Sequence, residues 1–308
     1  MDNIVKNQHY IPQMYLKRFC TLNNQLYAYD KLKDQGFYNL PLAYAHEKYF
    51  YDLDPDTLLQ MLETYYPLID PVSKERLSQT QAIEKMLGRI EGDADSVLDR
   101  LNDDPSVLSD ETAQIILIHF LHSLSIRTVA QRSQIENIHH QTADWLKQFG
   151  ISANPEVVEY VNSTPEAYSK KWQIGRLLSP DAALEFAQMV MLNYDWYYGM
   201  VNSDLNLIIS DNPVQMLAFG FNDCCFPISP KRAIIFRARG DDVKILSHDK
   251  PEKGVINLST RSVYIYNLIQ QSQAERFLFG DKISIEFLKA IKKISESGLQ
   301  NQFPKKTL

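Results

Sequence analysis

The stretch Ile208-Ile209-Ser210-Asp211-Asn212-Pro213-Val214 marks the point where a buried strand ends in a stiff turn. The run at 205–209 that leads into it is rich in Leu and Ile and predicts the strand. Asp and Asn side chains can bond nearby backbone amides, and proline cannot continue a β-ladder. We therefore expect Asp211 either to aim its carboxylate at a pocket or simply to end the strand.

Other segments with strand periodicity surround this turn. We expect a four-stranded antiparallel sheet from residues 196–201, 205–209, 233–237 and 243–246. The long connection at 211–230 is of a kind that is often functional. Nearer the N-terminus, 25–31 and 36–40 predict a β-hairpin that joins this sheet or covers its edge.

Helical periodicity dominates the middle of the chain. The spacing predicts helices over 55–66, 79–101, 109–149, 180–192, 251–270 and 283–294. The segment 109–149 reads as one long helix whose apolar centre forms the spine of the helical part. Within 251–270, Val263-Tyr264-Ile265-Tyr266 also fits a strand.

Together these elements predict an α+β fold, with a mainly helical part packed on a small, mostly antiparallel sheet. The length of 308 residues and a hydrophobic content of 44% permit a large core. We expect a single domain over 1–308, with an N-terminal motif and hairpin at 1–54, a helical part at 55–192, and the sheet with C-terminal helices at 193–308.

Composition limits the functional classes. A net charge of −6 excludes a basic field over the whole surface, although a local basic groove stays open. Three cysteines, no secretory signal and no apolar run of about 20 residues predict a cytoplasmic protein without a membrane partner. Gly-rich phosphate loops, Gly-x-Ser-x-Gly and His-Glu-x-x-His are all missing from the sequence. Nothing in it fixes the oligomeric state.

Two acidic residues border the apolar stripe of the 79–101 helix. Glu84 and Glu91 stand two turns apart on one face, where they could bind a cation or a buried arginine, or lie on a solvated flank. Arg127 follows an apolar run and needs a carboxylate or a phosphate as partner. We predict that Glu84 faces Arg127, with Glu91 as the other suitable acid.

Several histidines leave alternatives open. His9 precedes a short helix that begins near Pro12, and it is either a capping or core group or a catalytic one. His119 and His122 could ligate a metal at their i, i+3 spacing, or lie in the core. Arg132 and His139 show the Arg…His spacing of a helical ribonuclease family, which is a loose match.

The opening HYIPQMYLKRF (9–19), the strand YAYDK (27–31) and HEKYFYDLD (46–54) together resemble the bacterial domain-of-unknown-function family 4238. That family typically begins with His-Tyr-x-Pro-x-x-Tyr-Leu-x-x-Phe. The resemblance continues in Ile83-Glu84…Ile90-Glu91, Arg127-Thr128, Ser210-Asp211-Asn212-Pro213 and Phe226-Pro227-Ile228-Ser229-Pro230-Lys231. It implies that both glutamates are buried or functional. The chain departs from the family pattern at Val129, where a proline is expected.

We predict one polar pocket that hydrolyses a phosphate ester in a nucleic acid or a nucleotide. The predicted catalytic residues are His9, Arg127, Asp211 and Asn212; Lys231 and Tyr15 bind substrate; and Glu84, Glu91 and Asp211 hold a divalent metal, Mg or Mn. By analogy with other bacterial orphan proteins, such a hydrolase could be a toxin or a defence effector. The alternative is a non-catalytic scaffold protein in which the same residues form a structural network.

Overall fold

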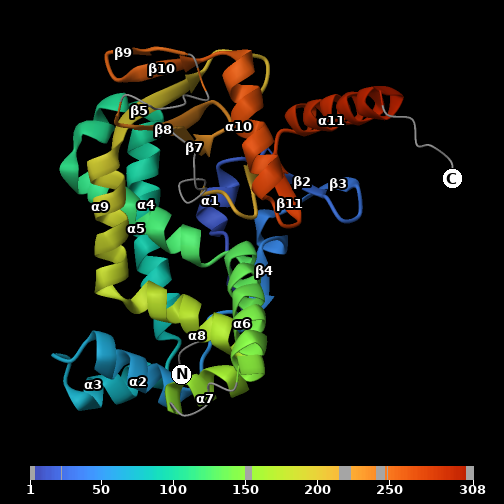
Figure 1. The fold of residues 1–308 in the computed structure, drawn as a ribbon. Helices are drawn as coiled ribbons and strands as arrows, with labels where there is room; N and C mark the ends of the chain where they lie inside the picture. The colour runs from blue at the N-terminus through green and yellow to red at the C-terminus, as the bar shows by residue number, and fades with distance from the viewer. Residues whose placement is uncertain are drawn as a thin grey trace, which may run out of the picture. The chain divides into compact units, whose positions relative to one another are not determined.

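The computed structural model describes residues 4–21, 23–149, 155–214, 223–240, 247 and 249–302. Helices and strands over these residues make an α+β arrangement, as predicted from the sequence (Figure 1). The chain divides into two compact units, each built from several stretches. The first comprises Met1–Met14, Leu42–Leu101 and Ser106–Tyr194, and the second Tyr15–Pro41, Asn102–Pro105 and Asp195–Leu308.

The first unit consists mainly of helices. These are α2 (Pro55–Tyr65), α3 (Pro71–Ser78), α4 (Ala82–Asp103), α5 (Glu111–Ile126), α6 (Val129–Phe149), α7 (Pro155–Asn162), α8 (Pro165–Leu178) and α9 (Pro180–Asn193). A proline in the first turn needs no N–H partner, and an Asp, Ser or Thr side chain before it can cap the helix. This signal begins α2, α3, α8 and α9, whose caps are Asp54, Asp70, Thr164 and Ser179.

Helices α4 and α5 supply much of the core of the first unit. The predicted stripe of α4 is buried at Ile83, Leu87, Ala94, Val97, Leu98 and Leu101. On α5, ten residues are buried, seven of them the consecutive stretch from Phe120 to Ile126. The apolar centre expected at this segment is therefore a buried helix.

The single helix predicted over 109–149 is wrong, because the chain bends by 52° between α5 and α6. Arg127 and Thr128 form the break without a proline or a glycine. The side-chain amide of Gln173 on α8 donates to the carbonyl oxygens of Ile126 and Thr128, at 2.8 and 3.0 Å. A partner remote in sequence thus takes over carbonyl groups that a continuous helix would use internally.

The N-terminus adds a small sheet to the first unit. Strand β1 (Asn7–His9) pairs antiparallel with β4 (His46–Lys48), which places His9 opposite His46. A short helix, α1 (Gln13–Lys17), follows Pro12 as predicted and passes from the first unit into the second.

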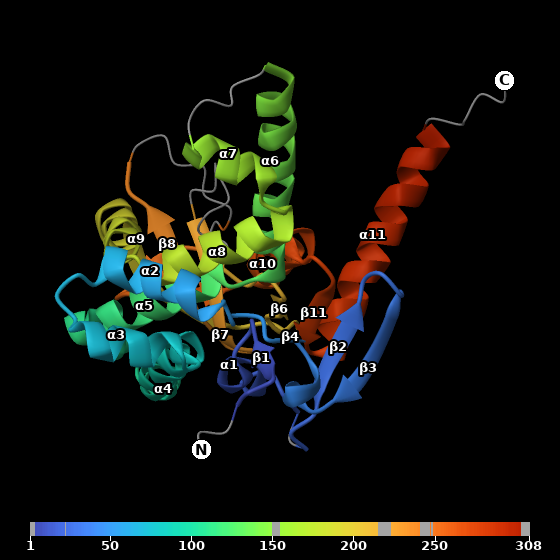
Figure 2. The ribbon, with the colours of Figure 1, turned by 90° about the horizontal axis from the view of Figure 1, so that it is seen from below.

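The second unit holds two sheets, where one sheet was predicted (Figures 1 and 2). The hairpin β2 (Leu26–Asp30) and β3 (Gln35–Asn39) forms as expected, in a four-stranded sheet of order β3-β2-β11-β6 with β11 (Phe277–Gly280) and β6 (Ile209–Ser210). The other sheet has the order β7-β8-β5-β10-β9. Its strands are β5 (Tyr194–Val201), β7 (Asp223–Ser229), β8 (Arg232–Ala238), β9 (Pro251–Glu252) and β10 (Val255–Leu258).

Three details of the second unit differ from the sequence prediction. The strand expected over 205–209 is reduced to Ile209–Ser210, and β7 occupies part of the predicted 211–230 connection. The helix expected over 251–270 begins only at Thr260, after Ser259 caps it, so Val263-Tyr264-Ile265-Tyr266 is helical in α10 (Thr260–Gln273). The chain continues into α11 (Lys282–Gln302). The segment predicted as a strand at 243–246 lies outside the described residues.

Among the described helices, none alone has both the length and the apolar character needed to cross a membrane. The bent pair α5 and α6 meets those criteria only when its two helices are counted together.

Candidate functional site

Arg127 is the centre of a polar cluster in the first unit. Its side chain is fully buried (0% exposed), and its Nη1 donates to Oε1 of Glu91 at 2.6 Å. Arg127 comes from the break after α5, and Glu91 comes from α4. The ion pair predicted for Arg127 therefore exists, but its hydrogen-bonded acid is Glu91 rather than Glu84.

Glu84 lies near this pair, in the first turn of α4. It is half-buried and lines a cavity of about 590 Å³ together with Tyr51 and Asp52. Burial raises the pKa of Glu84 to about 7, repulsion from Glu91 and Asp52 adds to the rise, and attraction to Arg127 opposes it. Glu84 therefore changes its charge close to neutral pH, unlike an ordinary glutamate.

His9 is held in the same cluster by β1. The neighbouring Gln8 donates from Nε2 to Oδ1 of Asp52 and accepts at Oε1 from the backbone N–H of Tyr51, both at 2.6 Å. Burial lowers the pKa of His9 to about 4, as do the nearby charges of His46 and Arg127. The imidazole is therefore neutral at pH 7.

Three buried nitrogen atoms of the cluster have no hydrogen-bond partner within the described part of the chain. They are Nε and Nη2 of Arg127 and Nε2 of His9. A buried polar group left unsatisfied costs about 1–3 kcal/mol, and more when it is charged. The cluster therefore has hydrogen-bonding capacity that a water molecule or an oxygen-rich ligand would use.

The phenol of Tyr51 completes the cluster. Its hydroxyl donates to the carbonyl oxygen of His9 at 3.0 Å, and it is close enough to Arg127, Glu84 and Glu91 for their charges to act on it. Burial raises the pKa of Tyr51 well above its usual range, so the phenol stays protonated. Sequence reasoning missed this residue, although it lies in the HEKYFYDLD stretch.

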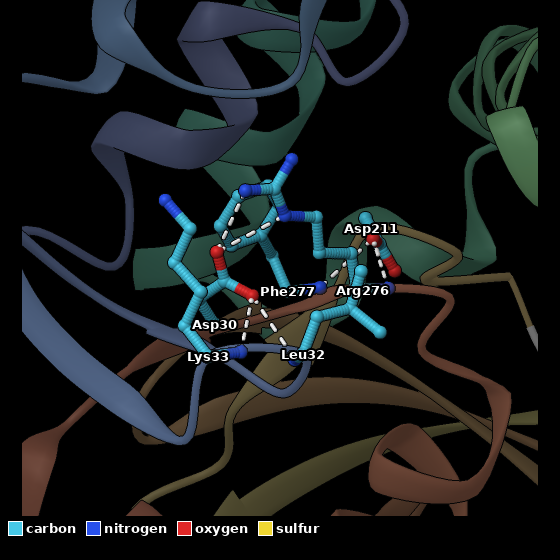
Figure 3. Close-up of polar contacts among 6 residues, drawn as sticks. All are labelled: Asp30, Leu32, Lys33, Asp211, Arg276 and Phe277. Atoms are coloured by element: carbon cyan, nitrogen blue, oxygen red, sulfur yellow. Dashed lines mark hydrogen bonds and ion pairs between the residues drawn. The ribbon is translucent and has the colours of Figure 1, made fainter.

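Asp211 belongs to the second unit, where its side chain holds the backbone at 275–277. Its carboxylate accepts the backbone N–H groups of Glu275, Arg276 and Phe277 at 2.9, 2.8 and 2.9 Å. Figure 3 shows the contacts to Arg276 and Phe277. Of the two readings left open by the sequence, these contacts favour the structural one. The side chain fixes the turn that leads into β11.

A second acid in Figure 3 was missed by the sequence reasoning. Asp30 ends β2, and its Oδ2 accepts from Nε and Nη2 of Arg276 at 3.0 and 2.7 Å. Its Oδ1 accepts the backbone N–H groups of Leu32 and Lys33. An aspartate at the end of a strand and before a polar turn is the signal that could have found it.

The other predicted site residues of the second unit also make contacts within that unit. The hydroxyl of Tyr15 donates to the carbonyl oxygen of Pro227 at 2.7 Å, and Nζ of Lys231 donates to that of Ser203 at 2.7 Å. The backbone N–H of Asn212 donates to Oγ of Ser210. The structure thus gathers His9, Glu84, Glu91 and Arg127 in one unit. A pocket shared with Asp211, Asn212, Lys231 and Tyr15 stays a prediction.

Of the residues considered as metal ligands or ribonuclease-like groups, His122, Arg132 and His139 have core contacts, whereas His119 is exposed on α5. The ring of His122 packs against Phe186 with centroids 5.4 Å apart. Arg132 lies over the Phe50 ring, and His139 bonds the carbonyl oxygen of Tyr160. Over the described part of the chain, no group of three His, Cys, Asp or Glu side chains is arranged to hold a metal ion. The predicted trio of Glu84, Glu91 and Asp211 is divided between the two units, so it stays a prediction.

The sequence profile of one family, described as a protein of unknown function (DUF4238), matches residues 7–284. The chain belongs to this family. No curated protein and no solved structure matches it. The matched range includes every residue of the Arg127 cluster, so the cluster lies within the part that the family shares.

Proposed function

We propose that the protein is a hydrolase that acts on a phosphate ester, and that Glu84 is its general base. The observation that carries the proposal is that Glu84 faces a cavity and has a pKa of about 7, beside a buried arginine. A base whose pKa lies near the working pH combines a large ionised fraction with good proton affinity. The substrate we propose is a nucleic acid or a nucleotide.

In the proposed reaction, ionised Glu84 takes a proton from the attacking water. The water oxygen forms a bond to phosphorus, the ester P–O bond breaks, and the departing oxygen is protonated by Glu84 or by solvent. Arg127 offsets the growing negative charge on the phosphoryl oxygens. Its Nε and Nη2 groups, which have no partner among the described residues, are suited to phosphate oxygens.

Glu91 and His9 have supporting roles in this proposal. Glu91 holds Arg127 through the 2.6 Å ion pair and keeps the pKa of Glu84 high by repulsion. Neutral His9 offers a ring nitrogen for hydrogen bonding. Both are positioning residues, because their described contacts are with the protein itself.

The test is hydrolysis of bis(p-nitrophenyl) phosphate, single-stranded DNA and RNA oligonucleotides, and nucleoside triphosphates. Glu84→Gln should lower the rate by about 10²–10⁴-fold, the usual contribution of a general base. Glu63→Gln, at an exposed position of α2, is the matched control and should keep the wild-type rate. The wild-type rate should rise with pH, with a midpoint of about 7, because the ionised form of Glu84 is the active one.

Parallel assays with EDTA and with added MgCl₂ or MnCl₂ test the metal-assisted form of the reaction. Loss of the rate in EDTA and its recovery with MgCl₂ or MnCl₂ would assign the metal-assisted form, and a rate that continues in EDTA would assign the metal-free one. A hydrolase rate that Glu84→Gln leaves unchanged would contradict the proposal.

A non-catalytic interaction protein is the second candidate. The contacts of Asp211, Lys231 and Tyr15 favour it, because all three bond to the backbone of their own unit. It predicts no turnover of any substrate in the panel, while substitutions in the Arg127 cluster still alter stability. For either function we propose the bacterial cytoplasm as the location, in keeping with three cysteines that form no disulfide.

A further inference from the structure

The second unit contains a cavity that the proposed chemistry does not use. It has a volume of about 760 Å³ and lies between α10, α11 and the β2–β3 hairpin. Figures 1 and 2 both show α11 extending beside these elements. The cavity therefore combines parts of the chain that are more than 200 residues apart in sequence.

Lysines dominate the charge of this cavity. Lys31, Lys289, Lys292 and Lys293 line it, against one acid, Asp34, which gives a formal charge of +3. The whole chain has a net charge of −6. Positive charge is therefore concentrated at this cavity although the chain as a whole is negative. A cleft lined by charges of one sign attracts ligands of the opposite sign.

Two of these lysines are held in place by the protein. Nζ of Lys31 donates to the carbonyl oxygens of Gln271 and Ala274 at the end of α10. Nζ of Lys289 lies 4.3 Å from the centre of the Tyr29 ring and 3.2 Å from Oδ1 of Asp34. The positive charge at the base of the cavity is thus fixed before any ligand binds, which lowers the entropic cost of binding.

The other two lysines extend the charge along α11. Lys292 and Lys293 are exposed and follow Lys289 by three and four residues, so they lie about one helical turn further along the same side. A series of cations spread along a hollow fits an extended chain of phosphates better than one small anion. A flat membrane surface fits less well, because the side chain of Lys289 is only 17% exposed.

We infer that this cavity, the α10–α11 groove, binds the phosphate backbone of a single-stranded nucleic acid. The inference does not depend on Glu84 or on hydrolysis. It requires only that the lysines of the groove contact phosphates, and it names a nucleic acid as the partner of the second unit.

The test uses the full-length chain and fluorescein-labelled 15-nucleotide oligo(dT) and oligo(U), with binding measured by fluorescence anisotropy. We expect the double variant Lys292→Gln/Lys293→Gln to weaken binding at least tenfold in 50 mM salt. Each phosphate contact to a single strand contributes about 0.7 to the slope of log K against log salt. Loss of two contacts should therefore reduce that slope by about 1.4.

Control variants distinguish loss of the groove lysines from a change in net charge, from unfolding and from hydrolysis of the probe. Lys48→Gln/Lys147→Gln removes the same charge from exposed positions of the first unit and should bind as the wild type does. Lys292→Arg/Lys293→Arg keeps the charge and should retain the affinity, and thermal melting verifies folding of each variant. Repeating the titration in the Glu84→Gln chain prevents hydrolysis of the probe and separates failure of the groove from failure of the proposed chemistry.

Equal binding by wild type and by Lys292→Gln/Lys293→Gln would overturn the inference. So would the absence of oligonucleotide binding in 50 mM salt. Binding to phosphatidylserine vesicles without binding to either oligonucleotide would instead assign the groove to a membrane surface, and would also overturn it.

Discussion

Glu91 compensates a fully buried positive charge, that of Arg127. Its removal leaves the guanidinium buried without a carboxylate, and loss of one partner of a buried pair costs about 3–5 kcal/mol. We expect Glu91→Ala to lower the free energy of unfolding by that amount in urea denaturation. Glu63→Ala, at an exposed site, should change it by less than about 0.5 kcal/mol. If Glu91→Ala and Glu63→Ala lowered the free energy of unfolding equally, the Arg127–Glu91 ion pair would be no stronger than a surface contact.

Glu84 should make stability depend on pH in a defined direction. Its pKa is about 7 in the folded protein and ordinarily 4.5, so folding favours the protonated form. This contribution is complete below pH 4.5 and is lost as pH rises through about 7. The melting temperature of wild type should therefore fall relative to that of Glu84→Gln between pH 5 and 8. Melting curves that shift in parallel for the two proteins would contradict this.

Asp211 should matter for folding more than for chemistry. Replacement by alanine leaves three part-buried N–H groups without their acceptor, and each lost hydrogen bond costs about 1 kcal/mol or more. We expect Asp211→Ala to lower the free energy of unfolding by at least about 3 kcal/mol. Asp204→Ala, an exposed change in the same unit, is the control. A stable Asp211→Ala protein without hydrolase activity would instead assign Asp211 to the active site.

Some of the site could be predicted from single residues. Arg127 after an apolar run required a buried acid, and the structure supplies one on α4. The sequence could not show whether Glu84 or Glu91 pairs with Arg127, because both acids border the same apolar stripe of α4. The partner is selected by how α4 packs against the break between α5 and α6. Gln8 and Tyr51 were not predicted, because each makes a hydrogen bond to a backbone group that is remote in sequence.

The break between α5 and α6 depends on Gln173 of α8. This side chain is fully buried, donates to two carbonyl groups at the break and accepts from Nε of Arg132 at 2.8 Å. We expect Gln173→Ala to cost about 3 kcal/mol in urea denaturation, since two buried carbonyl groups and the part-buried Nε of Arg132 lose their partner. Gln141→Ala, exposed on α6, should be neutral. A neutral Gln173→Ala would show that the break is set by local sequence.

Element boundaries were predictable where local signals decide them. The helices predicted over 55–66 and 180–192 begin where α2 and α9 do, at a proline that follows an aspartate or serine cap. The break at Arg127-Thr128 has no such signal, because Val129 occupies the first position of α6 where proline would mark a new helix. The tetrapeptide at 263–266 fits both the strand period and the helix period. It is helical in the structure, where Ser259 caps the start of α10.

At the scale of the whole molecule, the class of fold was predictable, but the pairing of strands remote in sequence was not. Alternating and helical periods together correctly indicated α+β. However, β6 pairs with β11, and β11 pairs with β2, which lies about 250 residues earlier in the chain. Strand partners at such separation are selected by packing of the complete unit, which periodicity within one segment does not encode.

The proposed active site depends most on a glutamate, Glu84, that ionises near neutral pH beside Arg127. Carbon-13 NMR of the glutamate side-chain carboxyl groups, recorded from pH 4 to 9 on selectively labelled protein, measures this directly. Wild type should show one carboxyl resonance with a midpoint of about 7, and that resonance should vanish in Glu84→Gln and persist in Glu63→Gln. Titration of every glutamate at an ordinary value of about 4–5 would contradict the proposed active site.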